Sequence, residues 1–386
     1  MMRSRDADDR QAKVARIESG ILPLALSAED AGSQAMPMDL CARMNALKVP
    51  GVSLAVVEHG QLSWARSYGV RKAGTDQAIG DKTLFEIGST TKLVTAIVAL
   101  QLVEKGMIGL DEDVNLALVG WKIPESEYTV SEKVTLRRLL NHTSGIPATN
   151  FNWEMDSTPA LEQVLRGEFP ADNAKATVTA VPGSEHAYSN LGYVVIQRLI
   201  EDITAKPFSE VVQAHVLGPL GMDDSTFNPD PANHLVCLPH DGDGIAHPLQ
   251  LHPSAIAQGG LLSTPSDLAR LAIDLMEGAQ GRSSRVLQPD TIQRMLQPDP
   301  QLDIEKWSGF TDGQGLGLFL LKRGDNMKFL APGMNLPGST GLILAWPARG
   351  FAVTLTTNGL NGQQLQVEIL NSIGVEYGLD WGLQIG

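Results

Sequence analysis

The chain has 386 residues, 43% of them hydrophobic and 19% charged, which is typical of a soluble globular protein with a sizeable core. Its formal net charge of −14 argues against nucleic acid or an anionic membrane as the main partner, because both bind basic surfaces. The N-terminus is too charged for a signal peptide and no apolar run could span a bilayer, so we expect a cytoplasmic protein. Cys41 and Cys237 lie far apart in no metal or redox spacing, so we expect buried thiols and no disulfide framework.

Patterns typical of strands occur near the N-terminus. A short helix is expected over 38–47, and residues 51–57 and 62–69 are two strand-like runs around His59-Gly60 that predict a hairpin. The next segment, 93–105, contains no Pro or Gly, is apolar on almost every side and ends at Gly106. It predicts a buried helix.

Between about 107 and 300 the chain is rich in Pro, Asn and Gly, and helical segments alternate with long irregular connections. The helices expected there are 136–140, 191–204, 207–217 and 265–277. Strand patterns return near the C-terminus, at 315–322, 341–346 and 351–357, and a helix over 363–373 follows.

This order predicts an α/β (α+β) fold, in which an antiparallel sheet from both chain ends is flanked by helices and a large, mainly helical segment is inserted. We expect residues 1–105 and 305–386 to form the sheet domain and 106–304 the helical domain, with the active site between them.

Ser89 and Lys92 lie three residues apart at the entrance of the helix expected over 93–105. That spacing puts both side chains on one face of the first turn. A serine hydroxyl needs a base to act as a nucleophile, and a lysine can be that base once desolvation lowers its pKa. The alternative is structural: Ser89 caps the helix and Lys92 extends its ammonium group to the surface.

Tyr188-Ser189-Asn190 is a second candidate, located after Pro182-Gly183 and before the helix expected over 191–204. A phenol can relay a proton, and an amide can hold the lysine and bind a substrate carbonyl. The alternative is that Ser189 or Asn190 caps the helix and Tyr188 only packs.

Four segments together resemble the serine β-lactamase and penicillin-binding-protein superfamily, and within it the class C β-lactamase and DD-peptidase family. That family includes esterases and acyltransferases. The segments agree with it in order and spacing from about residue 50 to 360. They are Phe85-Glu86-Ile87-Gly88-Ser89-Thr90-Thr91-Lys92, Leu139-Leu140-Asn141-His142-Thr143-Ser144-Gly145, Tyr188-Ser189-Asn190 and Gly259-Gly260-Leu261-Leu262-Ser263-Thr264-Pro265-Ser266-Asp267-Leu268.

The resemblance implies a catalytic Ser89 that becomes acylated, Lys92 as its base, Tyr188 as the proton relay and Asn190 as a substrate-binding residue. It also implies an oxyanion hole made by the N–H of Ser89 and one N–H from a strand near the C-terminus. His142 is expected to be structural and to hold the loop beneath the site.

One motif of the family is altered in this chain. The family carries Lys-Thr-Gly or His-x-Gly on the C-terminal strand, and here the basic position falls on Ala331 or Pro332. Neither side chain can bind a substrate carboxylate. Penicillins and D-Ala-D-Ala peptides would lose their anchor, whereas neutral esters would lose little. Esterase and acyl-transfer relatives with a non-basic residue fit this pattern.

No His-x-x-x-His zinc spacing, complete calcium loop or Gly-x-Ser-x-Gly elbow occurs, so we expect no metal and no cofactor. The first hypothesis is a carboxylesterase that acts on a small neutral ester through an acyl-enzyme on Ser89. The alternatives are a β-lactamase, a D-amino-acid peptidase or amidase, or an acyltransferase that uses the same residues. A catalytically silent binding protein is the alternative from another class. The sequence leaves the oligomeric state open.

Overall fold

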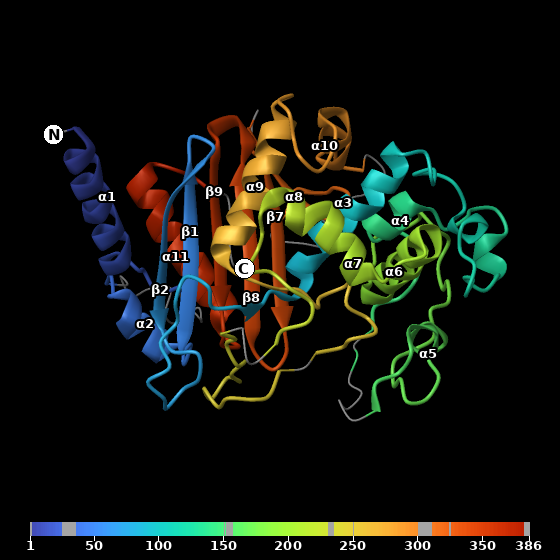
Figure 1. Cartoon of the computed structure of the whole chain (residues 1–386), viewed down its shortest axis with the longest axis horizontal. Helices are drawn as coiled ribbons and strands as arrows, with labels where there is room; N and C mark the ends of the chain where they lie inside the picture. The colour runs from blue at the N-terminus through green and yellow to red at the C-terminus, as the bar shows by residue number, and fades with distance from the viewer. Residues whose placement is uncertain are drawn as a thin grey trace.

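The computed structural model describes residues 2–24, 36–149, 151, 157–230, 235–249, 251–299, 311–323 and 326–381. Within these residues, a seven-stranded antiparallel sheet has the order β2-β1-β9-β8-β7-β6-β5 (Figure 1). The strands are β1 (Gly51–Glu58), β2 (Gln61–Gly69), β5 (Gly313–Gln314), β6 (Phe319–Arg323), β7 (Asn326–Asn335), β8 (Ser339–Trp346) and β9 (Phe351–Thr357). The two ends of the chain join where β1 pairs with β9, from Val52↔Thr357 to Val57↔Ala352. The predicted sheet from both chain ends is confirmed.

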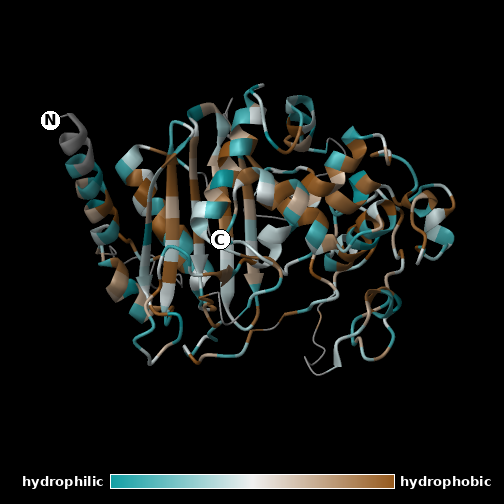
Figure 2. Cartoon of the chain, viewed as in Figure 1, coloured by the Kyte–Doolittle hydropathy of each residue, from teal (hydrophilic) through white to brown (hydrophobic). Residues whose placement is uncertain are grey.

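The sheet separates two hydrophobic cores, because successive side chains of a strand point to opposite faces. In β1, Val52 and Leu54 belong to the core beneath α1, α2 and α11, whereas Ala55 and Val57 belong to the core that contains α3, α6 and α9. Figure 2 shows hydrophobic residues along the central strands and on the helices beside them. The helices are α1 (Met2–Ser19), α2 (Leu40–Ala46), α3 (Thr91–Glu104), α6 (Asn190–Thr204), α9 (Pro265–Ala279) and α11 (Gly362–Tyr377).

Helix α3 is the buried helix that the sequence predicts. A 3₁₀ turn, η2 (Gly88–Thr90), leads into it, and every residue from Thr91 to Leu102 is buried. The chain leaves the helix through Gly106, whose φ of +65° is the left-handed conformation that glycine adopts without strain. A buried, mostly apolar helix therefore crosses the core and places its first turn next to the sheet.

The part of the chain between α3 and β5 contains most of the remaining helices, and Figure 1 places α4, α5 and α6 on the side of α3 away from α1. Its remaining helices are α4 (Leu136–Leu140), α5 (Leu161–Arg166), α7 (Phe208–Val212), α8 (Gly218–Leu220) and α10 (Pro289–Met295). The helix predicted over 207–217 is observed as α7, which continues into a π-helical turn over Gln213–Leu217. The domain limits at 105 and 305 stay a prediction.

Two sequence predictions are wrong. The strand expected over 315–322 begins only at Phe319, because Gly315 to Leu318 form a turn that packs on α3: a Cβ on Gly317 would lie 2.3 Å from that of Ala96. Cys41 is exposed rather than buried, since it lies on the outer side of α2; Cys237 is buried as expected.

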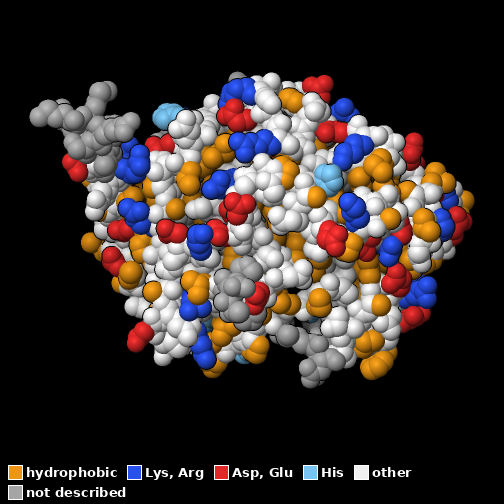
Figure 3. Space-filling view, viewed as in Figure 1, with side chains coloured by type: hydrophobic (Ala, Val, Ile, Leu, Met, Phe, Trp, Pro, Cys, Tyr) orange, Lys and Arg blue, Asp and Glu red, His pale blue; other side chains and the backbone are white. Residues whose placement is uncertain are grey.

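Acidic and basic side chains are interspersed on the face of the molecule that Figure 3 shows. Among the described helices, none combines the length and the apolar character needed to cross a membrane.

Candidate active site

Ser89 and Lys92 lie at the junction of η2 and α3, beside β7. The Lys92 Nζ is 3.0 Å from the Ser89 Oγ, so the side chains meet as their spacing predicts. Gly88 has a φ of +53°, and a Cβ on it would lie 2.6 Å from the backbone nitrogen of Met334. A glycine is therefore needed before the serine for the turn to lie directly against β7.

Lys92 is only 3% exposed, which excludes the alternative in which its ammonium group reaches the surface. Burial lowers the pKa of Lys92 well below its ordinary value, because a charged ammonium group loses its hydration there. Besides Ser89, its Nζ contacts the Oδ1 of Asn190 at 2.8 Å and the carbonyl oxygen of Gln258 at 2.6 Å.

These contacts fix the role that a neutral Lys92 can play. A neutral amine has two N–H donors and one lone pair. Asn190 Oδ1 and the Gln258 carbonyl are both acceptors, so they take the two N–H groups and leave the lone pair for the hydroxyl proton of Ser89. The amide of Asn190 is oriented for this, since its Nδ2 donates to the carbonyl oxygen of Thr149 at 3.2 Å. The arrangement suits a base directed at Ser89.

Tyr188 approaches the serine from the other side, and its hydroxyl donates to the Ser89 Oγ at 2.7 Å. Burial raises the pKa of Tyr188 to about 12, and the hydrogen bond with Ser89 offsets only part of that rise. The phenol is therefore protonated at neutral pH and can donate a proton. The hydroxyl of Tyr188, the hydroxyl of Ser89 and the amine of Lys92 form one chain of proton donors and acceptors.

His142 supports the turn that carries Tyr188. The backbone N–H of Ser189 donates to its Nδ1 at 3.1 Å, and its ring lies 4.3 Å from the ring of Tyr188, measured between centroids. Burial is the main cause that lowers the pKa of His142, so the imidazole is neutral and accepts at Nδ1. Ser189 caps α6, because its Oγ accepts from the N–H of Gly192 at 3.0 Å. The expected structural place of His142 beneath the site agrees with these contacts.

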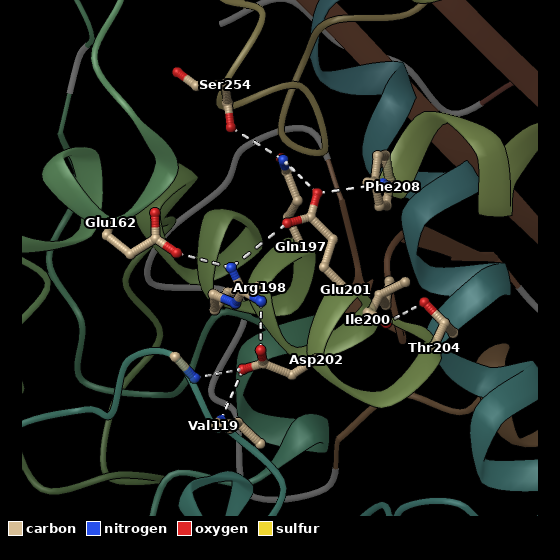
Figure 4. Close-up of polar contacts among 11 residues, drawn as sticks. Val119, Glu162, Gln197, Arg198, Ile200, Glu201, Asp202, Thr204, Phe208 and Ser254 are labelled. Atoms are coloured by element: carbon tan, nitrogen blue, oxygen red, sulfur yellow. Dashed lines mark hydrogen bonds and ion pairs between the residues drawn. The ribbon is translucent and has the colours of Figure 1, made fainter. Parts of the chain in front are cut away.

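Gln197, further along α6, holds the segment that supplies the Gln258 carbonyl. Its Nε2 donates to the carbonyl oxygen of Ser254 at 3.0 Å, and its Oε1 accepts from the N–H of Ala257 at 3.1 Å. Thr95 of α3 fixes the same segment through the carbonyl oxygen of Ala257 at 2.7 Å. Figure 4 shows Gln197 at one end of a cluster of polar contacts on α6.

That cluster ties α6 to its neighbours. In Figure 4, Arg198 lies between Glu162 of α5 and Asp202 of α6, and Asp202 accepts from the backbone N–H of Val119 at 2.8 Å. The helix that begins with Asn190 is thereby anchored at the end remote from the site. Asn190 and Tyr188 are held through this helix and its cap.

Strand β7 forms the opposite side of the site. The hydroxyl of Thr90 donates to the carbonyl oxygen of Ala331 at 3.0 Å, and a Cβ on Gly333 would lie 2.7 Å from the nitrogen of Ser89. Ala331 and Gly333 share the face of the strand that meets η2, whereas Pro332, opposite Leu342, points toward α11. The side chain at the position of the altered motif is therefore the methyl group of Ala331.

A cavity of about 160 Å³ opens beside Ser89. Ser89 and Asn190 line one side of it, and Met334 and Asn335 of β7 line another. No Lys or Arg is among the described residues that line it. His252 is the one basic side chain among those residues, and burial lowers its pKa, which favours the neutral imidazole.

The structure brings Ser89, Lys92, Tyr188 and Asn190 together, as the sequence predicts. It adds two groups that the sequence reasoning missed. The carbonyl of Gln258 carries no side-chain signal, although it directly precedes the Gly259-Gly260 segment. Glu86 lines the cavity and is 2% exposed; a lone charge in the apolar run Leu84-Phe85-Glu86-Ile87 was a signal that could have identified it.

Comparisons with known proteins agree with this geometry. The family model described as "Beta-lactamase" matches residues 39–371. Penicillin-binding protein 4 of Amycolatopsis lactamdurans is 29% identical over 323 residues, which cover 81% of each chain. The octameric penicillin-binding protein homologue of Pyrococcus abyssi has a TM-score of 0.75 at 26% identity, covering 89% of this chain and 76% of its own. EstCE1, a hydrolase with promiscuous acyltransferase activity, shares the fold with a TM-score of 0.73 at 19% identity, covering 94% of this chain and 98% of its own.

Proposed function

This chain belongs to the beta-lactamase family and is a serine hydrolase, and we propose that it is a carboxylesterase that cleaves neutral esters through an acyl-enzyme on Ser89. The observation that carries the proposal is the hydrogen-bonded chain from the Tyr188 hydroxyl through the Ser89 Oγ to the Lys92 Nζ.

In the acylation step, neutral Lys92 takes the hydroxyl proton of Ser89 as the Oγ attacks the ester carbonyl carbon. Tyr188 gives its proton to the departing alkoxide and regains one from Lys92, since both groups contact the Ser89 Oγ. An alcohol leaves, an ester of Ser89 forms, and Lys92 is neutral again.

Deacylation repeats the sequence with water. Lys92 takes a proton from a water molecule that attacks the acyl carbon. The bond between the acyl carbon and the Ser89 Oγ then breaks, the Oγ takes the proton back from Lys92, and the acid is released with Lys92 neutral again. The developing oxyanion would be held by the N–H of Ser89 and by backbone of the Gly333–Met334 segment of β7, which lies against the serine turn.

The preference for neutral esters rests on the side chains that face the cavity. Ala331 replaces the basic residue on the face that meets η2, and no Lys or Arg is found among the described lining residues. A carboxylate in this cavity would lose hydration without gaining a Lys or Arg partner among the described lining residues, whereas a neutral ester carries no such cost.

The test is turnover of a panel of p-nitrophenyl esters and of a chromogenic cephalosporin by the full chain and by Ser89→Ala. We expect ester hydrolysis that Ser89→Ala abolishes, with much slower cephalosporin turnover. Cephalosporin turnover that exceeds ester turnover would favour a β-lactamase. No turnover together with no mass increase after treatment with a fluorophosphonate would favour a silent binding protein.

Two other activities fit the same residues and are tested in parallel. D-amino-acid amides probe the amidase alternative, and release of an ester product from an added alcohol probes acyl transfer. We expect both to be slower than hydrolysis of the preferred ester by water.

A further inference from the structure

Glu86 is an acidic residue in the wall of the cavity that the reaction described above does not use. It lies on the short strand β3 (Phe85–Glu86), three residues before Ser89, and both residues line the cavity. Its side chain is buried, yet its Oε2 has no hydrogen-bond partner among the described residues. A buried carboxylate oxygen without a partner is costly, and such groups in native proteins call for an explanation.

The surroundings of Glu86 offer one polar side chain and no cation. Burial raises the pKa of Glu86 to about 7, and a hydrogen bond with the Asn335 side chain offsets part of that rise. Asn335 is itself held, because its Nδ2 donates to the carbonyl oxygen of Gly259 at 3.2 Å. In the described part of the chain, no Lys, Arg or His forms an ion pair with Glu86.

We propose that Glu86 determines specificity by binding a hydrogen-bond donor of the substrate, so that the preferred esters carry an ammonium or hydroxyl group on the acyl chain. The free Oε2 is the acceptor for that group. The proposal rests on the esterase function proposed above. It keeps the discrimination against carboxylates and extends the substrate class from neutral esters to esters that carry an ammonium group.

The proposal follows from the charges of the side chains that line the cavity. An ammonium group that enters it meets a carboxylate and no competing cation, and a hydrogen bond between charged groups is stronger than one between neutral groups. A carboxylate that enters meets Glu86 without any Lys or Arg to offset the repulsion. The chain thus has no basic residue at Ala331 of β7 and has an acidic residue, Glu86, in the cavity wall, which reverses the charge preference.

Four methyl esters of equal chain length up to the variable group test this preference. They are methyl 3-aminopropanoate, methyl 3-hydroxypropanoate, methyl butanoate and monomethyl succinate, with an ammonium, hydroxyl, methyl or carboxylate group at the end of the acyl chain. Hydrolysis by the full chain is followed by base uptake at constant pH 8. We expect kcat/KM to fall in that order, with the ammonium ester preferred over methyl butanoate by about tenfold or more.

The same ratio is then measured in Glu86→Gln, which keeps the shape of the side chain and removes its charge. The ammonium-to-methyl ratio should fall about tenfold, and any loss common to both esters cancels in the ratio. Glu104→Gln is the matched control, because Glu104 ends α3 far from the cavity and accepts from the N–H of Gln288. Its ratio should equal that of the wild type.

A wild-type ratio at or below one, or an unchanged ratio in Glu86→Gln, would overturn the proposal. Should Glu86→Gln not fold, calorimetric binding of methyl 3-aminopropanoate and methyl butanoate to Ser89→Ala decides the same question without turnover. Tighter binding of the ammonium ester supports the proposal, and equal or weaker binding overturns it. Failure of all four esters to be hydrolysed, with the ammonium ester still bound more tightly, would refute the esterase function and leave the role of Glu86 standing.

Discussion

The two sides of the active site are built in different ways. On the helical side, Lys92, Tyr188 and Asn190 are each held by named hydrogen bonds, and a second layer of side chains holds their neighbours. On the strand side, β7 presents a methyl group at Ala331 and backbone at Gly333 and Met334. In the proposed reaction, the helical side supplies the groups that transfer protons, and the strand side supplies the backbone that lies against the serine turn.

This difference shows that the reaction and the recognition of charge are separable in this fold. The groups proposed to activate the serine come from α3, from the start of α6 and from the segment just before it, and their contacts with Ser89 and Lys92 do not involve the side chain at position 331. A change of one residue on β7 can therefore alter which substrates bind while the proton-transfer groups stay in place. The predictions below probe each side in turn.

The largest effect is expected on the helical side. Ser89→Ala should lower kcat/KM for the preferred p-nitrophenyl ester at least about 10³-fold, since the acyl-enzyme cannot form. Ser266→Ala, at the start of α9, is the control and should change kcat/KM by no more than about twofold. Residual turnover of more than a tenth in Ser89→Ala would show that another group is the nucleophile.

Loss of the phenol should have the next largest effect. Tyr188→Phe keeps the ring that packs on His142 and removes the proton donor, so kcat should fall about 10²-fold. Esters with a good leaving group, such as p-nitrophenol, should be affected less than methyl esters, because p-nitrophenolate needs no proton. Equal losses for both kinds of ester would contradict the relay role.

The pH profile tests the state of Lys92. The base must be neutral, so kcat/KM is lost as the pH falls through the pKa of Lys92 and is constant above it. Because burial lowers that pKa, the midpoint should lie well below the value of about 10.4 for a free lysine, with about a tenfold loss per pH unit beneath it. A midpoint of the pH profile near the pKa of a free lysine would show that Lys92 is not held as a buried neutral amine in solution.

A smaller effect is expected on the strand side. Ala331→Lys restores a cation on the face of β7 that meets the site, and it should raise kcat/KM for monomethyl succinate relative to methyl butanoate by about tenfold. Ala331→Met matches the added length without the charge and should leave that ratio unchanged. An equal rise in both variants would indicate a change of shape rather than of charge.

The smallest effect concerns stability near Glu86. A carboxyl whose pKa is raised to about 7 in the folded protein favours folding when protonated, and that contribution is lost as the pH rises through about 7. Glu86→Gln removes this loss. Between pH 5 and pH 8, the free energy of unfolding of the variant should therefore fall less than that of the wild type, by at most about 3 kcal/mol. Urea unfolding of both proteins at both pH values measures these free energies. An equal fall in the wild type and the variant would contradict the prediction.

The sequence was informative where function depends on short spacing. Ser89 and Lys92 lie one helical turn apart, and Tyr188 and Asn190 lie two residues apart on either side of the extended Ser189, so local geometry already brings each set together. The assembly of the two sets could be inferred only from the family resemblance, because 98 positions separate Lys92 from Asn190.

Other features depend on contacts that no local pattern encodes. To decide whether Ala331 or Pro332 takes the position of the family's basic residue, one must know which face of β7 meets η2. The pairing of β7 with β8 sets that face. The carbonyl of Gln258 is a backbone atom, and its position is fixed by Gln197 and Thr95 from other helices. The strand predicted from 315 begins at Phe319 because Gly315 packs on Met295 of α10 and Gly317 packs on α3, a tertiary effect that overrides the local pattern.

The contact between the serine turn, η2, and strand β7 has a consequence for biosynthesis. The hydroxyl of Thr90 meets the carbonyl of Ala331 across 241 positions of the chain, so the serine turn cannot rest on its strand while that strand is still being translated. Contacts of such long sequence separation form late and slowly. The nascent chain therefore carries its nucleophile for most of its synthesis without the surface that would hold an oxyanion. Reactivity toward an active-site acylating reagent should appear only after the final strands have left the ribosome.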